Sequence, residues 1–144
     1  MKTRYSSLVG IKKDAMQKSE RLLQEQNHLL QKAQKAHADA LEALEEIQTP
    51  QGGKISDLLA SRGLFDAQRV IVQKNQEWVS YAHSQVQQAK EALKKAMIEY
   101  EKFNYLELEE MKKILQEQKI QEAKNLDEIA LLTHTRKMAK NSLL

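Results

Sequence analysis

The sequence predicts an all-α protein, a long antiparallel two-helix coiled-coil hairpin with helices of unequal length. Charged residues make up 30% of the chain and aromatic residues only 5%, a composition typical of long helices with a narrow apolar seam. Apolar residues recur at heptad spacing in two long segments. Between these segments lie the single proline, Pro50, and two glycines, Gly52 and Gly53, which favour a reversal of the chain. We expect one domain over residues 1–144.

The first helix is expected over residues 4–48, with Ser6 or Ser7 as its N-cap. Its predicted seam combines two heptad tracks. One track is Leu8, Ala15, Leu22, Leu29, Ala36 and Ala43, and the other is Lys12, Ser19, Gln26, Ala33, Ala40 and Ile47. Polar residues occupy the first half of the second track, which predicts looser packing toward the start of this helix.

A turn and a short helix are expected over residues 49–63, with Ser56 as cap and Gly63 as terminator. The alternative is a second helix that begins near Ser56 and is kinked, but we favour a break at Gly63. The main second helix is then expected over residues 64–140.

The most regular heptads lie in this second helix. Its two tracks are Val72, Val79, Val86, Leu93 and Tyr100, and Asn75, Ala82, Ala89, Ala96 and Phe103. After Phe103 the apolar positions continue with an offset through Leu108, Met111 and Leu115, which predicts a stutter that locally unwinds the supercoil.

Charge and composition argue against several classes of protein. The 23 Lys and Arg residues are interleaved with 20 Asp and Glu residues, so a nucleic-acid-binding face is not expected. The absence of cysteine excludes disulfides and Cys-based zinc sites. No apolar run has the length of a signal peptide core or a membrane span, so we expect a cytoplasmic protein.

No catalytic pattern is present in the sequence, so we expect no enzyme, no cofactor and no metal. The histidines, His28, His37, His83 and His134, lack the spacing of metal ligands and are interpreted as solvent-facing. The glycines at Gly52 and Gly53 follow a predicted helix rather than a strand, which does not fit a phosphate-binding loop.

Three parts of the sequence are candidates for exposed residues that contact a partner. Trp78 and Tyr81 form an aromatic pair suited either to a partner or to packing beside the seam. Phe65 lies near the turn, where the first helix covers it poorly. Residues 126–137 carry more apolar side chains than a seam requires, and periodicity alone equally suits a frayed helix end.

The C-terminal element Leu126-Asp127-Glu128-Ile129-Ala130, followed by Arg136, resembles the signature of the FliJ family. The opening Tyr5-Ser6-Ser7-Leu8-Val9 and the unequal antiparallel helices are also similar to that family. The resemblance covers essentially the whole chain. It implies a fold similar to the two-helix stalk of a rotary ATPase gamma subunit, in a component of the bacterial flagellar type III protein-export apparatus.

The resemblance also implies partners: the hexameric flagellar export ATPase, the cytoplasmic domain of the membrane-embedded export gate, and export chaperones. Asp127, Glu128 and Arg136 are then expected to bind the ATPase ring. Phe65 and Val72 are expected to bind the gate. The other gate positions of the family fall on polar residues here, at Gln68 or Arg69 and at Asn75 or Gln76, which departs from the family pattern.

Two alternatives stay open at this point. One is the equivalent stalk of a virulence type III secretion system, which genomic neighbours would distinguish. The other is a generic structural coiled coil that self-associates through the seam of residues 72–103, whereas the hairpin is expected to be a monomer that reaches the membrane only through its partners.

Overall fold

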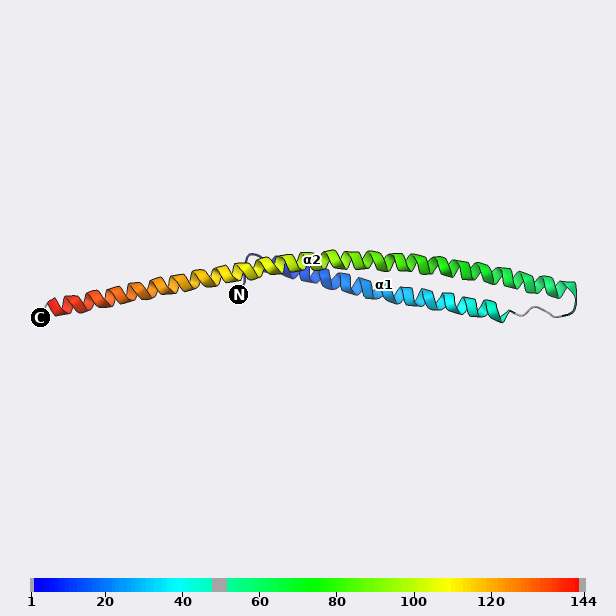
Figure 1. Cartoon of the computed structure of the whole chain (residues 1–144), viewed down its shortest axis with the longest axis horizontal. Helices are drawn as coiled ribbons and strands as arrows, with labels where there is room; N and C mark the ends of the chain where they lie inside the picture. The colour runs from blue at the N-terminus through cyan, green and yellow to red at the C-terminus, as the bar shows by residue number, and fades with distance from the viewer. Residues whose placement is uncertain (1, 48–51, 143–144) are drawn as a thin grey trace. The chain divides into compact units, whose positions relative to one another are not determined.

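A computed structural model describes residues 2–47 and 52–142 of the chain. Helix α1 covers Ser6–Glu46 (41 residues) and helix α2 covers Ile55–Ser142 (88 residues), and the described residues contain no strand. The two helices pack side by side and run in opposite directions (Figure 1). The predicted hairpin of unequal helices is therefore confirmed. Of the predicted turn, Gly52 and Gly53 are described, and Gln48 to Gln51, with Pro50, lie outside the described residues.

Thr3, rather than Ser6 or Ser7, caps the start of α1. The Tyr5 N–H donates to Thr3 Oγ1 at 3.1 Å, and the Thr3 N–H donates to Ser6 Oγ at 2.8 Å. This reciprocal pair satisfies backbone donors at both positions, as a capping box does. The predicted cap is wrong because the hydroxyl of Ser6 closes the box from inside the first turn.

Helix α2 begins at Ile55 and passes through Gly63 without interruption, so the predicted break there is wrong. A glycine in a helix interior costs only about 1 kcal/mol relative to alanine, too little to end a helix whose flanking residues favour it. Ser56 is likewise inside the helix rather than its cap. The backbone that enters α2 takes a positive φ of 119° at Gly53, a conformation that suits glycine.

The chain divides into two compact units. Unit 1 comprises Met1–Lys12 and Glu99–Leu144, and unit 2 comprises Lys13–Ile98. All the buried residues of the described chain, Ala40, Ala82, Val86 and Ala89, belong to unit 2. The expectation of a single domain stays a prediction.

The seam of α1 uses one of the predicted tracks and replaces the other. The track from Lys12 to Ile47 is half-buried or buried throughout. Its companion is displaced by one residue, because the half-buried positions are Val9, Met16, Leu23, Leu30, His37 and Leu44. The predicted companions, apart from Ala43, are exposed. His37 therefore faces the seam, contrary to the expectation that every histidine faces solvent.

Heptad spacing alone cannot choose between these companions. Positions three before and four before Lys12 both lie within one helical turn of it, so Val9 and Leu8 fit the period equally well. The side on which α2 lies decides the choice.

The seam of α2 follows both predicted tracks through Phe103, and Val86 is its most buried member at 3% exposure. The predicted stutter is wrong. Half-buried positions keep the heptad step through Glu107, Glu110 and Ile114. Of the predicted offset positions, Leu108 and Leu115 are exposed, and only Met111, next to Glu110, is half-buried. The step is kept because Glu107 and Glu110 find polar partners on the N-terminal residues within unit 1.

Val86→Ala should lower the free energy of unfolding by about 1–3 kcal/mol, because it removes two methyl groups from the best-packed point of unit 2. Val70→Ala is the matched control, since Val70 lies on the same helix and is 52% exposed. Urea unfolding followed by far-ultraviolet circular dichroism measures both. Equal losses in the two variants would contradict the packing described for Val86.

Gly63→Ala should raise local stability by about 0.5–1 kcal/mol, because the position is helical and an added Cβ meets open space. The measurement is amide hydrogen exchange of residues 60–66. Gly53→Ala should have the opposite effect on the start of α2, since φ is 119° there. Faster exchange of residues 60–66 in the Gly63 variant would contradict an uninterrupted helix at this position.

Candidate partner-binding surfaces

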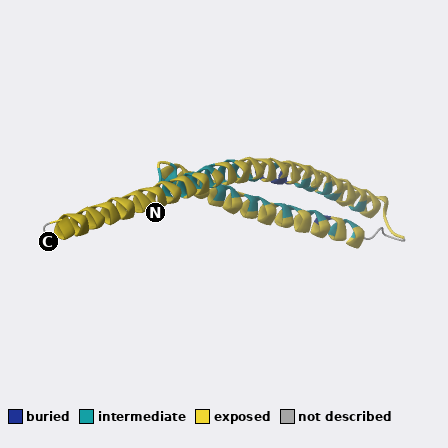
Figure 2. Cartoon of the chain, turned by 60° about the vertical axis from the view of Figure 1, so that its left-hand side comes forward, coloured by how far each residue is buried: buried dark blue, intermediate teal, exposed yellow. Residues whose placement is uncertain are grey.

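The C-terminal part of α2, residues 115–142, is exposed along its whole length (Figure 2). The last half-buried residue before it is Ile114. Large apolar side chains stand in solvent on this part of the helix: Leu115, Ile120, Leu126, Ile129, Leu131, Leu132 and Met138. Exposed apolar residues concentrated on one helix typically mark a surface for a partner. The alternative of a frayed end is not what the structure shows, because the segment is helical to Ser142.

The predicted ring-binding residues all lie on this exposed segment but not on one face. Glu128 and Arg136 are eight residues apart with Leu132 midway, so the three form a row along one side of the helix. Ile129 is seven residues before Arg136 and lies beside this row. Asp127 is nine residues before Arg136, which places it about 180° around the helix from the arginine. Within residues 52–142, no ion pair joins the three charged residues.

Phe65 lies in unit 2 near the start of α2. Ile47, the last described residue before the turn, lies close to it. Its side chain is 40% exposed and lines a hollow of ≈ 310 Å³. The other walls of the hollow are Ile47, Leu58, Ser61 and Arg62. The position is thus a partly covered apolar site with a cation at its rim.

Val72 is placed differently from Phe65. It is half-buried and lies one heptad further along the same face, so its side chain belongs to the seam. The polar residue between them, Gln68, has a role in the hairpin, because its Nε2 donates to the Ala40 carbonyl oxygen at 2.9 Å. The family's gate pattern has an apolar residue at this position or the next. In this chain Gln68 instead makes a contact between the helical segments of unit 2.

Trp78 and Tyr81 stand largely in solvent, with their rings edge to face at 6.0 Å between centroids. They border a groove of ≈ 330 Å³ whose opposite wall includes Leu29, Ala33 and Ala36 of α1. The sequence left open whether this pair contacts a partner or packs beside the seam. Its exposure favours contact with a partner.

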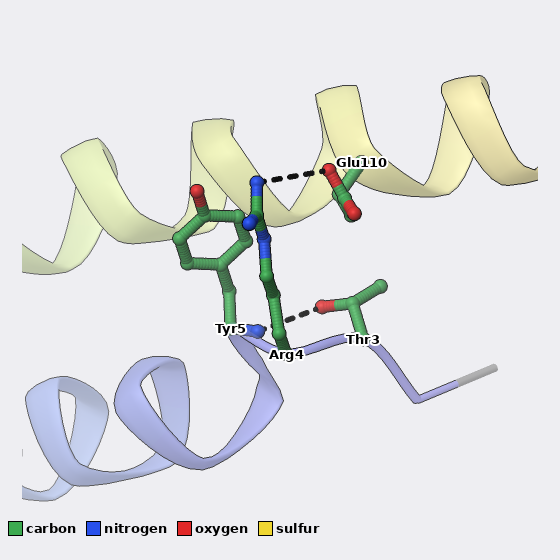
Figure 3. A network of polar contacts seen from close by, with 4 residues as sticks. All are labelled: Thr3, Arg4, Tyr5 and Glu110. Atoms are coloured by element: carbon green, nitrogen blue, oxygen red, sulfur yellow. Dashed lines mark hydrogen bonds and ion pairs between the residues drawn. The ribbon is translucent and has the colours of Figure 1, made fainter.

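Sequence reasoning missed a set of polar contacts in unit 1, here called the N-terminal polar cluster. Its members are Arg4, Ser6, Lys12, Glu99, Phe103, Glu107 and Glu110. The Arg4 guanidinium lies 5.0 Å from the centre of the Tyr5 ring and reaches Glu110 on α2, with 3.6 Å between Nη2 and Oε2 (Figure 3). The sequence did contain a signal for this cluster, because Glu107 and Glu110 stand at heptad positions after Phe103. The apolar residues one position later suggested an offset seam instead.

Two further contacts complete the cluster. The Ser6 hydroxyl donates to Glu107 Oε1 at 2.9 Å. Lys12 Nζ lies 3.7 Å from Glu99 Oε2 and 5.6 Å from the centre of the Phe103 ring. The polar residue Lys12 in the α1 seam therefore has both an ionic and an aromatic partner.

No group of three His, Cys, Asp or Glu side chains among the described residues is arranged to hold a metal ion. That this protein is not an enzyme and uses no cofactor or metal remains a prediction.

None of the described helices combines the length and the apolar character needed to cross a membrane.

Comparison with known proteins identifies one family. A family model described as "Flagellar FliJ protein" matches residues 1–139. No curated protein and no solved structure matches the chain. The family is associated with flagellar type III protein export and is not known as an enzyme family. Because the match spans nearly the whole chain, and the hairpin carries the exposed C-terminal element from which the resemblance was drawn, this protein belongs to the FliJ family.

Proposed function

We propose that this protein is a stalk-like component of the flagellar type III export apparatus that binds both the hexameric export ATPase and the export gate. In this proposal it promotes assembly of the ATPase ring and protein export, as the stalk of a rotary ATPase gamma subunit sits in its ring. It works in the cytoplasm, at the inner face of the membrane, and reaches the membrane only through its partners. Export chaperones complete the proposed partners and are not assigned to particular residues.

The observation that carries the proposal is the exposed helix over residues 115–142. A helix that is formed before it meets a partner loses less conformational entropy on binding than a segment that must fold. Its apolar side chains supply area for burial, and its charges supply orientation. We therefore assign the ring contact to the row of Glu128, Leu132 and Arg136 with Ile129 beside it.

Arg136→Glu should weaken ring binding by about tenfold or more, because a reversed charge repels the group that the arginine meets. The measurements are ATP hydrolysis by the export ATPase as the protein is titrated in, and ring assembly by light scattering. Lys94→Glu, an exposed cation of unit 2, is the control, and helicity should be unchanged in both variants. An equal loss from both variants would contradict a C-terminal ring contact.

The helical geometry sharpens this test. Glu128 shares a face with Arg136, whereas Asp127 lies on the opposite side. If one face meets the ring, Glu128→Lys should reduce ATPase stimulation more than Asp127→Lys. If the ring instead encloses the helix on all sides, the two variants should lose stimulation alike.

For the gate, we propose Phe65 as the main contact and Val72 as its neighbour on the same face. Phe65→Ala should weaken binding to the cytoplasmic domain of the gate protein by about thirtyfold, because truncating an aromatic anchor in a pocket costs about 2 kcal/mol. Leu64→Ala is the control, since Leu64 is exposed and does not line the hollow. Val72→Ala is unsuitable alone, because Val72 also packs in the seam. Retained gate binding in the Phe65 variant would overturn the assignment.

A self-associating coiled coil is the weaker candidate. The α2 positions that would pair with a second copy, including Ala82, Val86 and Ala89, are buried within unit 2. The proposal is therefore a monomer in isolation, which the mass in solution at micromolar concentration tests. The flagellar description of the matching family favours the flagellar apparatus over a virulence secretion system.

A further inference from the structure

The contacts inside unit 1 differ in kind from the contacts inside unit 2. In unit 2, Ala40, Ala82, Val86 and Ala89 are buried, and the Gln68 side chain donates a hydrogen bond to the Ala40 carbonyl oxygen. Among the described residues of unit 1, none is buried. The helical segments of unit 1 are joined by the N-terminal polar cluster together with apolar side chains that are only half-buried, among them Val9, Leu106 and Met111.

The ion pairs of the cluster are partly exposed to solvent. The side chains of Arg4 and Glu110 are 70% and 21% exposed, and those of Lys12 and Glu99 are 33% and 45% exposed. Exposed pairs of this kind stabilise weakly, and dissolved salt screens them. Apolar burial of the type seen around Val86 is not screened in this way. The two units should therefore respond differently to ionic strength.

We propose that residues 3–12 form a salt-releasable clasp, which detaches from residues 99–110 of α2 while unit 2 stays closed. Release uncovers Phe103, Glu107 and Glu110, an aromatic and acidic face that the clasp covers in the closed state. Such local opening below the free energy of global unfolding is expected where few apolar contacts hold a segment. The inference goes beyond the proposed function and does not depend on it, because it concerns the isolated chain.

The first test is amide hydrogen exchange of the full-length chain at low salt and at about 1 M NaCl, where charges are screened beyond about 3 Å. Exchange rates are referred to the unfolded chain under the same conditions. Amides of residues 6–12 should exchange about three- to tenfold faster at high salt, the change expected from losing weak exposed pairs. Amides of residues 82–89 should not change. Equal acceleration of both segments, or of neither, would overturn the proposal.

The second test is a charge swap between Arg4 and Glu110. At low salt, Arg4→Glu and Glu110→Arg should each accelerate exchange of residues 6–12, and the double variant should restore protection. Arg21→Glu is the matched control, because Arg21 is an exposed arginine of α1 outside the cluster. Single variants without effect, a swap that fails to restore protection, or equal acceleration of residues 82–89 would each show that the ion pair does not hold a separate clasp.

Discussion

The structure depends on how little a two-helix seam can bury. Two helices without a third layer cover only one stripe of each other, and here the seam residues that become buried are three alanines and Val86. Alanines let the backbones approach closely, and Val86 fills the space that this approach leaves. The other seam positions must follow the same heptad spacing, because only that spacing keeps them facing the partner helix. This holds even where the residue is polar.

That constraint explains the polar residues in the seam. Glu107 and Glu110 occupy heptad positions where an apolar residue would ordinarily lie. Because Ser6 and Arg4 lie within reach, the carboxylates remain paired and the helix continues without a stutter. Gln68 meets the Ala40 carbonyl oxygen in the same way in unit 2. Polar seam contacts contribute little stability, but they specify which positions face each other.

The same constraint leaves most of the surface free for partners. From Leu115 to Ser142 every described residue of the second helix is exposed, its large apolar side chains included. Helix formation there is supported by good helix formers and by the side-chain hydrogen bond from Gln121 to Asn125, one helical turn apart. In the proposed function the protein acts through these exposed surfaces, and its family is associated with flagellar protein export.

The sequence by itself determined the helical hairpin and the seam of the second helix through Phe103, because heptad spacing and composition are local properties. Only the tertiary structure decided which side of each helix faces the other. It selected Val9 over Leu8 and Glu107 over Leu108 as seam positions. The reason is physical: a heptad period locates a stripe to within one residue, whereas the position of the partner helix selects one of two neighbouring rows.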